Sequence, residues 1–444
     1  MRRGETSAVA VLEDCLSRIE ARQPQLNAFL YLDREGALGA AWAADRALAS
    51  GKAVGPLCGV PLAHKDMFDR IGRAPSCGSQ VPADRVPEAD AECLRRLDAA
   101  GALNLGGLNM SEFACNGWGY NDLAGPARNP HGVDHVAGGS SSGSAAAVAA
   151  GLVYGSLGSD TGGSVRLPAS WCGCVGLLPT RGLVPLAGAM KTSPSLDAIG
   201  PIARTAMDCA TLLGAVADGG VDYAMSAQHP LGRCSVGLPA LTDLDPAIRQ
   251  AMDDAVDRLD ALGVECRPML PLDLDRITAQ ANIVLLSELC ATHLEMLRTH
   301  GASYTPWVRD RMLTGIGIAA TDYIAALSQR GRALEAFCAT AFADADVLLL
   351  PVAPYLAPTL AAVQATIAGT GPALPDVGTY TRSTNYLGLP ALALPCGTNE
   401  DGLPTAVQFV GRPFSEALLL RLGHCFERVR HCSGSAGSRA EYHT

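Results

Sequence analysis

Two segments rich in glycine and serine hold the residues with the clearest capacity for chemistry. The first reads GGSSSGS over residues 138–144, and the second reads GSDTGGSVRLP over residues 158–168. Small residues let backbone N–H groups crowd around a bound anionic group. A serine that leaves a strand directly after Thr-Gly-Gly can lie among donors of its own loop, as an acyl-transfer oxyanion hole requires. Ser164 is therefore a candidate nucleophile, and Ser140 lies in the companion segment.

A serine nucleophile needs a base within hydrogen-bond reach, and the rare lysines supply the best candidate. Of the 34 basic residues only three are lysine, namely Lys52, Lys65 and Lys191. Arginine stays protonated in proteins, whereas a buried lysine can become neutral and accept a proton. Lys52 lies in a polar turn and Lys191 is ambiguous. Lys65 directly follows the strand-like run GVPLAH, so we predict that Lys65 is the base.

The nine histidines offer no comparable signature. His131 and His135 are four residues apart, but a glycine lies between them and no glutamate completes a zinc-protease motif, so we interpret them as surface-loop residues. His64 is next to Lys65, yet adjacent side chains on a strand point to opposite faces. Lysine and serine remain the better-matched set.

The elements that must position these groups alternate between helix and strand. Hydrophobic periodicity and capping residues predict helices over 8–21, 35–50, 88–101, 245–262 and 414–430, and a short helical turn over 109–113. Buried strands are expected before Lys65 and at 102–106, 347–350, 391–394 and 405–410. This alternation is typical of an α/β sheet covered by helices on both faces. No linker divides the chain, so we predict one domain over 1–432 and a flexible tail over 433–444.

Composition limits the partners. The net charge is −10 with no long basic run, which argues against nucleic acid or an anionic membrane as a partner. No apolar stretch is long enough to span a bilayer, and 48% hydrophobic residues support a large core, so we expect a cytoplasmic protein. The 15 cysteines form no CxxC pair, and the closest, Cys172 and Cys174, are poorly spaced for a metal. We expect no metal and no cofactor.

Several ordered blocks closely resemble the amidase signature family. They are GGSS at 138–141, GSDTGGS at 158–164, GVP at 59–61 leading to Lys65-Asp66, ASWCG at 169–173, NYLGLPA at 385–391 and PCG at 395–397. Ser140 follows Lys65 by 75 residues and Ser164 follows Ser140 by 24, which fits the family. The resemblance extends from about residue 8 to 430 and is strongest over 56–205. It implies a single α/β domain with a mixed sheet of about ten or eleven strands.

The resemblance also implies a mechanism. Ser164 would attack the carbonyl of a small-molecule amide, and Ser140, preceded by a cis peptide bond, would pass the proton to neutral Lys65. Burial of Lys65 must then outweigh the attraction of neighbouring Asp66. The backbone N–H groups of Thr161, Gly162, Gly163 and Ser164 would stabilise the oxyanion. Ala114, Cys115 and Met190 match positions near the family's substrate pocket. The sequence leaves open whether the chain forms a homodimer.

Some of these residues could have simpler structural roles, and two positions differ from the family pattern. Ser140 could also cap the helix that follows it. Arg166 could bind a substrate carboxylate, but we favour a structural ion pair, with Asp160 as the candidate partner. Ser142 stands where the family usually has glycine. Leu178 replaces the usual lysine of Gly-Leu-Lys-Pro-Thr.

Two other functions remain open. Residues 139–143 satisfy the G-x-S-x-G pattern of α/β-hydrolase esterases with Ser141 at its centre, but that interpretation needs a histidine base and leaves Lys65 unexplained. The family also includes subunits that supply ammonia to a tRNA-dependent amidotransferase. No clear glutamine-selective set is visible, so we predict a stand-alone amide hydrolase and keep a partner-dependent subunit as the alternative.

Overall fold

The computed structural model describes residues 1, 3–51, 54–83, 85–242 and 244–429. In this part of the chain eleven strands form one mixed sheet, in the order β1-β3-β2-β6-β8-β7-β12-β13-β11-β9-β10, and β4 and β5 form a separate pair. The strands of the large sheet are β1 (Phe29–Leu32), β2 (Pro61–Lys65), β3 (Leu103–Leu108), β6 (Gly155–Asp160), β7 (Val175–Leu178), β8 (Ala198–Ala203), β9 (Ser235–Pro239), β10 (Glu265–Met269), β11 (Val347–Pro351), β12 (Ala391–Thr398) and β13 (Pro404–Gly411). The separate pair is β4 (Arg128–Asn129) and β5 (Gly132–Val136).

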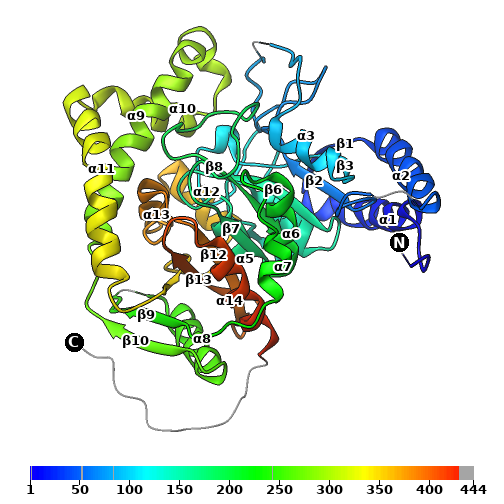
Figure 1. Cartoon of the computed structure of the whole chain (residues 1–444). Coiled ribbons are helices and arrows are strands. Elements are labelled where there is room, and N and C mark those ends of the chain that lie inside the picture. Colours follow the sequence, from blue (N-terminus) through cyan, green and yellow to red (C-terminus); the bar gives the residue numbers. More distant parts are fainter. Residues whose placement is uncertain (2, 52–53, 84, 243, 430–444) are drawn as a thin grey trace.

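The helices surround this sheet (Figure 1). The α-helices are α1 (Ala8–Leu26), α2 (Arg34–Ala49), α3 (Glu92–Ala99), α4 (Ser142–Ala149), α5 (Arg166–Trp171), α6 (Ala206–Val216), α7 (Tyr223–Gln228), α8 (Pro246–Ala261), α9 (Leu274–His300), α10 (Pro306–Leu313), α11 (Ala320–Ala341), α12 (Leu360–Ala368), α13 (Arg382–Leu387) and α14 (Glu416–Arg428). Three short 3₁₀ turns are η1 (Glu112–Ala114), η2 (Gly301–Ser303) and η3 (Thr314–Gly317).

The two faces of the sheet bury different clusters. Ile202 of β8 packs in the cluster that contains α4 and part of α5, whereas its neighbour Ala203 packs in the cluster that contains α6 and α14. Because successive strand residues point to opposite faces, helices cover the sheet on both sides. The predicted α/β class, the single domain and the strand number are therefore confirmed.

Strand direction explains how distant segments meet. β2 and β6 are parallel neighbours, with Leu62 opposite Gly155. The carboxyl ends of parallel strands lie at the same edge of a sheet. Lys65 ends β2 and Asp160 ends β6, so the lysine and the second glycine-rich segment lie close together.

Most expected elements are present with adjusted bounds. The helix expected over 8–21 extends to Leu26, capped by Ser7, and the helical turn expected at 109–113 is the 3₁₀ turn η1. The long helices α9 and α11 were not predicted individually. They lie side by side at one edge of the molecule (Figure 1). Lys52 and the predicted tail over 433–444, with the domain boundary at 432, lie outside the described residues.

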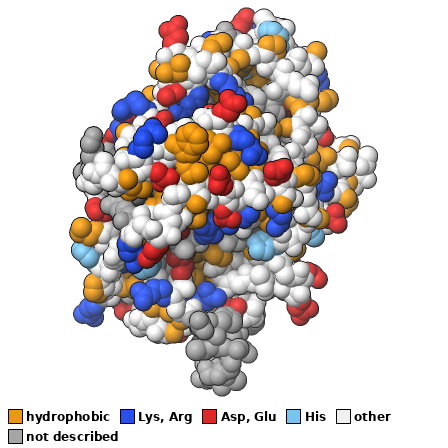
Figure 2. Space-filling model, turned by 90° about the vertical axis from the view of Figure 1, so that its right-hand side faces the viewer, with side chains coloured by type: hydrophobic (Ala, Val, Ile, Leu, Met, Phe, Trp, Pro, Cys, Tyr) orange, Lys and Arg blue, Asp and Glu red, His pale blue; other side chains and the backbone are white. Residues whose placement is uncertain are grey.

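The surface mixes both signs of charge. Figure 2 shows blue basic and red acidic side chains interspersed over the face that it views. Within the described residues, none of the helices combines the length and the apolar character that crossing a bilayer requires.

Candidate active site

Lys65 is the most unusual side chain of the site because it is a lysine with only 1% of its surface exposed. All five residues of β2 are buried, which carries Lys65 into the interior. Its Nζ donates hydrogen bonds to Ser140 Oγ at 2.6 Å and to Ser159 Oγ at 2.8 Å. The adjacent His64 instead accepts a hydrogen bond from Leu157 N at its Nδ1 (3.1 Å), and burial lowers the pKa of His64 to about 3.

The environment favours a neutral Lys65. Burial lowers the pKa of Lys65 to about 7, although the charges of Asp160 and Asp197 act in the opposite direction. Asp66, the carboxylate that the sequence places next to Lys65, accepts hydrogen bonds from Arg73 Nη1 at 3.0 Å and from Ser76 N at 3.0 Å. Desolvation therefore dominates, and at neutral pH a large fraction of Lys65 can carry a free lone pair.

Ser140 lies in a tightly packed turn just before α4. The Gly139–Ser140 peptide bond is cis, as the family resemblance implied. A Cβ atom at Gly139 would lie 2.4 Å from Gly119 N, so only glycine fits there. The Ser140 carbonyl accepts a hydrogen bond from Ser111 N at 3.1 Å. The Ser140 side chain is completely buried. Among the described residues of this turn, only its hydroxyl forms a hydrogen bond with Lys65 Nζ.

Asp160 shapes the turn that presents Ser164. Its Oδ1 accepts a hydrogen bond from Gly163 N at 2.7 Å and its Oδ2 one from Val165 N at 3.2 Å. The Gly163 N–H is therefore already engaged and is not a free oxyanion donor, contrary to the prediction. Among the described residues no acceptor is found for the N–H groups of Thr161, Gly162 and Ser164.

Arg166 completes the support beneath this turn. Its Nε lies 3.0 Å from Asp160 Oδ2, and both side chains are fully buried. The remaining guanidinium nitrogens donate to Thr384 Oγ1, Gln408 Oε1, Thr381 O and Asn385 Oδ1. Burial would raise the pKa of Asp160, but the Arg166 charge and the hydrogen bonds outweigh it and hold the pKa below its usual value. The predicted structural ion pair is confirmed.

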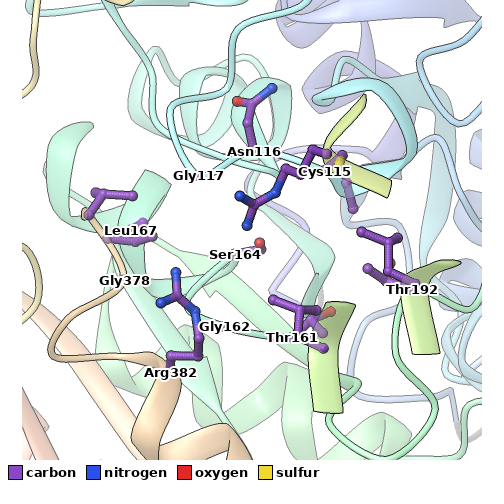
Figure 3. Close-up of a pocket in the computed structure, with 15 residues that line it drawn as sticks. Cys115, Asn116, Gly117, Thr161, Gly162, Ser164, Leu167, Thr192, Gly378 and Arg382 are labelled. Carbon is purple, nitrogen blue, oxygen red and sulfur yellow. The ribbon is translucent and has the colours of Figure 1, made fainter. Parts of the chain in front are cut away.

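A cavity open to solvent lies in front of Ser164. Figure 3 shows the Ser164 hydroxyl at the centre of this space, with Cys115 and Asn116 on one side and Arg382 on the other. The lining residues are Ala114, Cys115, Asn116, Gly117, Thr161, Gly162, Ser164, Leu167, Thr192, Leu285, Leu289, Arg311, Val377, Gly378 and Arg382. We call it the Ser164 cavity.

The sequence predicted part of this lining. Ala114 and Cys115 line the Ser164 cavity, but Met190 does not. Met190 lines a second, apolar cavity together with Asp197 and with Ser159, a hydrogen-bond partner of Lys65. The two arginines, Arg311 and Arg382, were missed because they come from segments without a recognisable local motif.

The geometry speaks against the esterase alternative. Ser141 is fully buried, stands at the N-cap position of α4 without a capping side-chain hydrogen bond, and donates to Ser159 O at 3.4 Å. It does not line the Ser164 cavity. Within the described ranges no histidine contacts Ser141, and the buried His293 instead contacts Tyr304 OH at 3.1 Å.

Comparisons with known proteins place the chain in a family. The family model described as Amidase matches residues 10–420. The A subunit of glutamyl-tRNA(Gln) amidotransferase from Lachnospira eligens is 34% identical, with 96% of each chain covered.

Solved structures agree. A structure described as an inhibitor-bound vestigial protein complex, which reveals the evolutionary origins of an s-triazine catabolic enzyme, has 34% identity and a TM-score of 0.89 over 96% of both chains. A structure described as an amidase has 35% identity and a TM-score of 0.87, also over 96% of both chains. This whole-chain agreement in sequence and fold excludes the α/β-hydrolase interpretation, and the chain belongs to the amidase signature family.

Proposed function

We propose that the chain hydrolyses a carboxylic amide by acyl transfer to Ser164, with Ser140 as the proton relay and Lys65 as the base. The observation that carries the proposal is the 2.6 Å contact between Lys65 Nζ and Ser140 Oγ. A buried amine with a pKa near neutrality is suited to general-base catalysis at physiological pH.

In the first step Ser164 Oγ attacks the amide carbonyl carbon. Its proton passes to Ser140 Oγ while the Ser140 proton passes to the lone pair of neutral Lys65 Nζ. The carbonyl oxygen becomes an oxyanion, and the N–H groups of Thr161, Gly162 and Ser164 are suited to stabilise it because they have no other acceptor among the described residues. The C–N bond then breaks, and the leaving nitrogen takes the proton back along the same relay.

The second step removes the acyl group. Water attacks the Ser164 ester, and Lys65 again accepts the proton through Ser140. The tetrahedral intermediate collapses with the C–O bond to Ser164 broken, the serine regains its proton, and a carboxylic acid is released. Ammonia or an amine and a carboxylate are therefore the products.

The cavity limits the substrate class. Leu167, Leu285 and Leu289 form apolar walls suited to a short hydrocarbon portion. Arg382 is neutralised by Asp376, with Nη1 and Oδ2 2.6 Å apart, whereas no salt bridge pairs Arg311 within the described part of the chain. The charge of Arg311 supports a substrate that brings an acceptor group, such as a carboxylate or a second carbonyl oxygen.

Ser164→Ala tests the nucleophile. This substitution should abolish turnover of small primary and aryl amides and abolish covalent labelling by a fluorophosphonate. Lys65→Ala should lower the rate by several orders of magnitude, and Lys65→Arg should not restore it because arginine keeps its proton. Labelling of the Ser164→Ala protein at the wild-type rate would place the nucleophile elsewhere.

A second candidate function shares this chemistry. The relative from Lachnospira eligens is an amidotransferase subunit, and so is a relative from Geobacter metallireducens, 35% identical over 97% of this chain. These names favour a chain that releases ammonia for a partner. The structure described as an amidase, with 35% identity, supports the stand-alone hydrolase, but the relatives named as amidotransferase subunits favour the partner-dependent alternative over it.

The purified chain alone decides between the two. A stand-alone hydrolase should cleave a chromogenic aryl amide, or transfer the acyl group of a simple primary amide to hydroxylamine, without any partner. A folded wild-type chain that is labelled at Ser164 but processes no amide by itself would favour the partner-dependent subunit.

A further inference from the structure

Asp197 connects two walls of the Ser164 cavity. Its Oδ1 accepts a hydrogen bond from Thr161 Oγ1 at 2.6 Å, and its Oδ2 accepts one from Thr192 N at 2.9 Å. Thr161 belongs to the turn that presents Ser164, and Thr192 belongs to the segment before β8. Both threonines line the cavity. One carboxylate therefore fixes the catalytic turn relative to the neighbouring segment of the cavity wall.

The charge of Asp197 is not neutralised by an ion pair. Within the described residues its partners are hydroxyl and backbone donors from Thr161, Thr192 and Ser193, with no lysine or arginine within salt-bridge distance. Burial raises the pKa of Asp197 to about 6, against the effect of these hydrogen bonds. Lys65 responds to this charge, since Asp197 and Asp160 are the two carboxylates that favour its protonated form.

A second buried carboxylate holds the same segment from the other side. Glu288 of α9 accepts hydrogen bonds from Ser193 Oγ at 2.6 Å, from Ser195 N at 2.9 Å and from Tyr323 OH of α11 at 2.8 Å. Arg330 of α11 also donates to Ser195 O at 3.0 Å. Segment 190–197 is thus braced between the long helices and the catalytic turn.

We propose that Asp197 is a positioning residue for acyl transfer, which holds the Thr161 side chain and thereby the turn of Ser164, and which places a negative charge in the same cavity as Ser159, a hydrogen-bond partner of Lys65. This inference rests on the proposed function. The inference adds Asp197 to the proposed catalytic machinery as a residue that touches neither the substrate nor the reacting atoms. Thr161 precedes Gly162, a proposed oxyanion donor, so a displaced Thr161 would misplace the N–H group of Gly162.

The two roles give separate signatures. The charges of Asp160 and Asp197 both act on Lys65 at the end of β2, and the charge of Glu288 of α9 acts on Asp197. Asp197→Asn removes one negative charge near Lys65, so the pKa of Lys65 should fall and the acidic limb of the pH–rate profile should move to lower pH. A purely structural role would lower the rate without moving this limb.

The second-order rate of Ser164 labelling by a fluorophosphonate, measured from pH 5 to 9, tests the inference. Asp197→Asn should move the midpoint of the profile to lower pH. Thr161→Val, which keeps the side-chain shape but removes the hydroxyl, should lower the plateau rate about 10-fold. Thr161→Ser, which keeps the hydroxyl, should restore most of that rate.

Glu416→Gln is the matched control. Glu416 is also a buried carboxylate that accepts a backbone hydrogen bond, from Thr180 N at 2.6 Å, and it does not line the Ser164 cavity. Its variant should keep the wild-type profile.

An unmoved midpoint in Asp197→Asn, or a Thr161→Val protein labelled as fast as wild type, would overturn the inference. If Asp197→Asn does not fold, the comparison of Thr161→Val with Thr161→Ser decides whether the hydrogen bond to Asp197 is needed. A folded wild-type protein that is not labelled at all would instead refute the proposed function.

Discussion

Lys65 and Arg166 are two buried basic residues of one site, and their surroundings treat the positive charge differently. Arg166 cannot lose its proton, and the fully buried Asp160 compensates its charge at 3.0 Å. Lys65 has only hydroxyl groups within hydrogen-bond distance among the described residues, and burial lowers its pKa to about 7. The arginine therefore supports the turn, and the lysine can exchange a proton.

Arg166→Met should strongly destabilise the fold. It leaves the buried Asp160 carboxylate without its partner, and breaking a buried ion pair in this way costs about 3–5 kcal/mol. Arg276→Met is a matched control, because the Arg276–Asp273 pair is about 60% exposed on both sides and should contribute less than about 1 kcal/mol. Urea unfolding of both variants measures the contrast, and equal midpoints would show that the buried Arg166–Asp160 pair contributes no more than the exposed one.

Arg311→Leu should weaken substrate binding more than the chemical step. Its guanidinium lines the Ser164 cavity, and a charge-assisted hydrogen bond to a substrate acceptor contributes about 1.5–3 kcal/mol, which is a rise in KM of roughly 10- to 100-fold. Arg309→Leu, on the same helix but paired with Asp310, is the control. An unchanged KM for every acceptor-bearing amide would show that Arg311 does not bind the substrate.

At the scale of the elements, the turn before α4 depends on a close backbone approach. A Cβ at Gly139 would lie 2.4 Å from Gly119 N and 2.8 Å from Ser111 Oγ, so the turn that holds Ser140 would have to shift. Gly139→Ala should therefore lower activity at least about 10-fold, since small displacements of catalytic groups are costly.

Gly39→Ala is the control for this change. Gly39 lies inside α2, where an added Cβ would have no described atom within 4 Å, and alanine favours a helix by about 0.5–1 kcal/mol. Thermal unfolding should show a small gain for Gly39→Ala with full activity. A fully active Gly139→Ala protein would mean that the turn tolerates the displacement.

Local patterns explain which elements the sequence could predict. β2, the serine segment at 138–144 and the turn at 158–168 have small residues and a strand-like approach that are visible in the sequence. The parallel pairing of β2 with β6 then brings them together. Arg311 and Arg382 reach the same cavity through tertiary packing of α10 and α13, which no local pattern encodes. The engagement of Gly163 N by Asp160 was equally invisible, because it depends on the folded turn.

At the scale of the whole molecule, a buried histidine couples stability to pH. His293 is 1% exposed, and burial lowers its pKa to about 4. The unfolded chain takes up a proton at this residue below about pH 6.5 while the folded chain does not, so this group destabilises the fold as the pH falls from 6.5 towards 4.

His293→Gln should remove this contribution. Relative to wild type, the free energy of unfolding of the variant should rise by about 2 kcal/mol between pH 7 and pH 5. Comparing the two proteins at each pH cancels the titration of the other groups, including Asp197 and Glu427, whose raised pKa values act in the opposite direction. A difference that does not vary with pH would show that His293 is accessible to protons in the folded state.

The role of Lys65 as the base depends on its protonation state, which NMR can observe directly. With only three lysines in the chain, lysine labelled with ¹³C at Cε gives a spectrum in which the Lys65 signal is assigned by its loss in Lys65→Arg. We expect this signal to titrate with a midpoint near pH 7. A midpoint above about 10, where an ordinary lysine titrates, would mean that Lys65 is charged at neutral pH and cannot be the base.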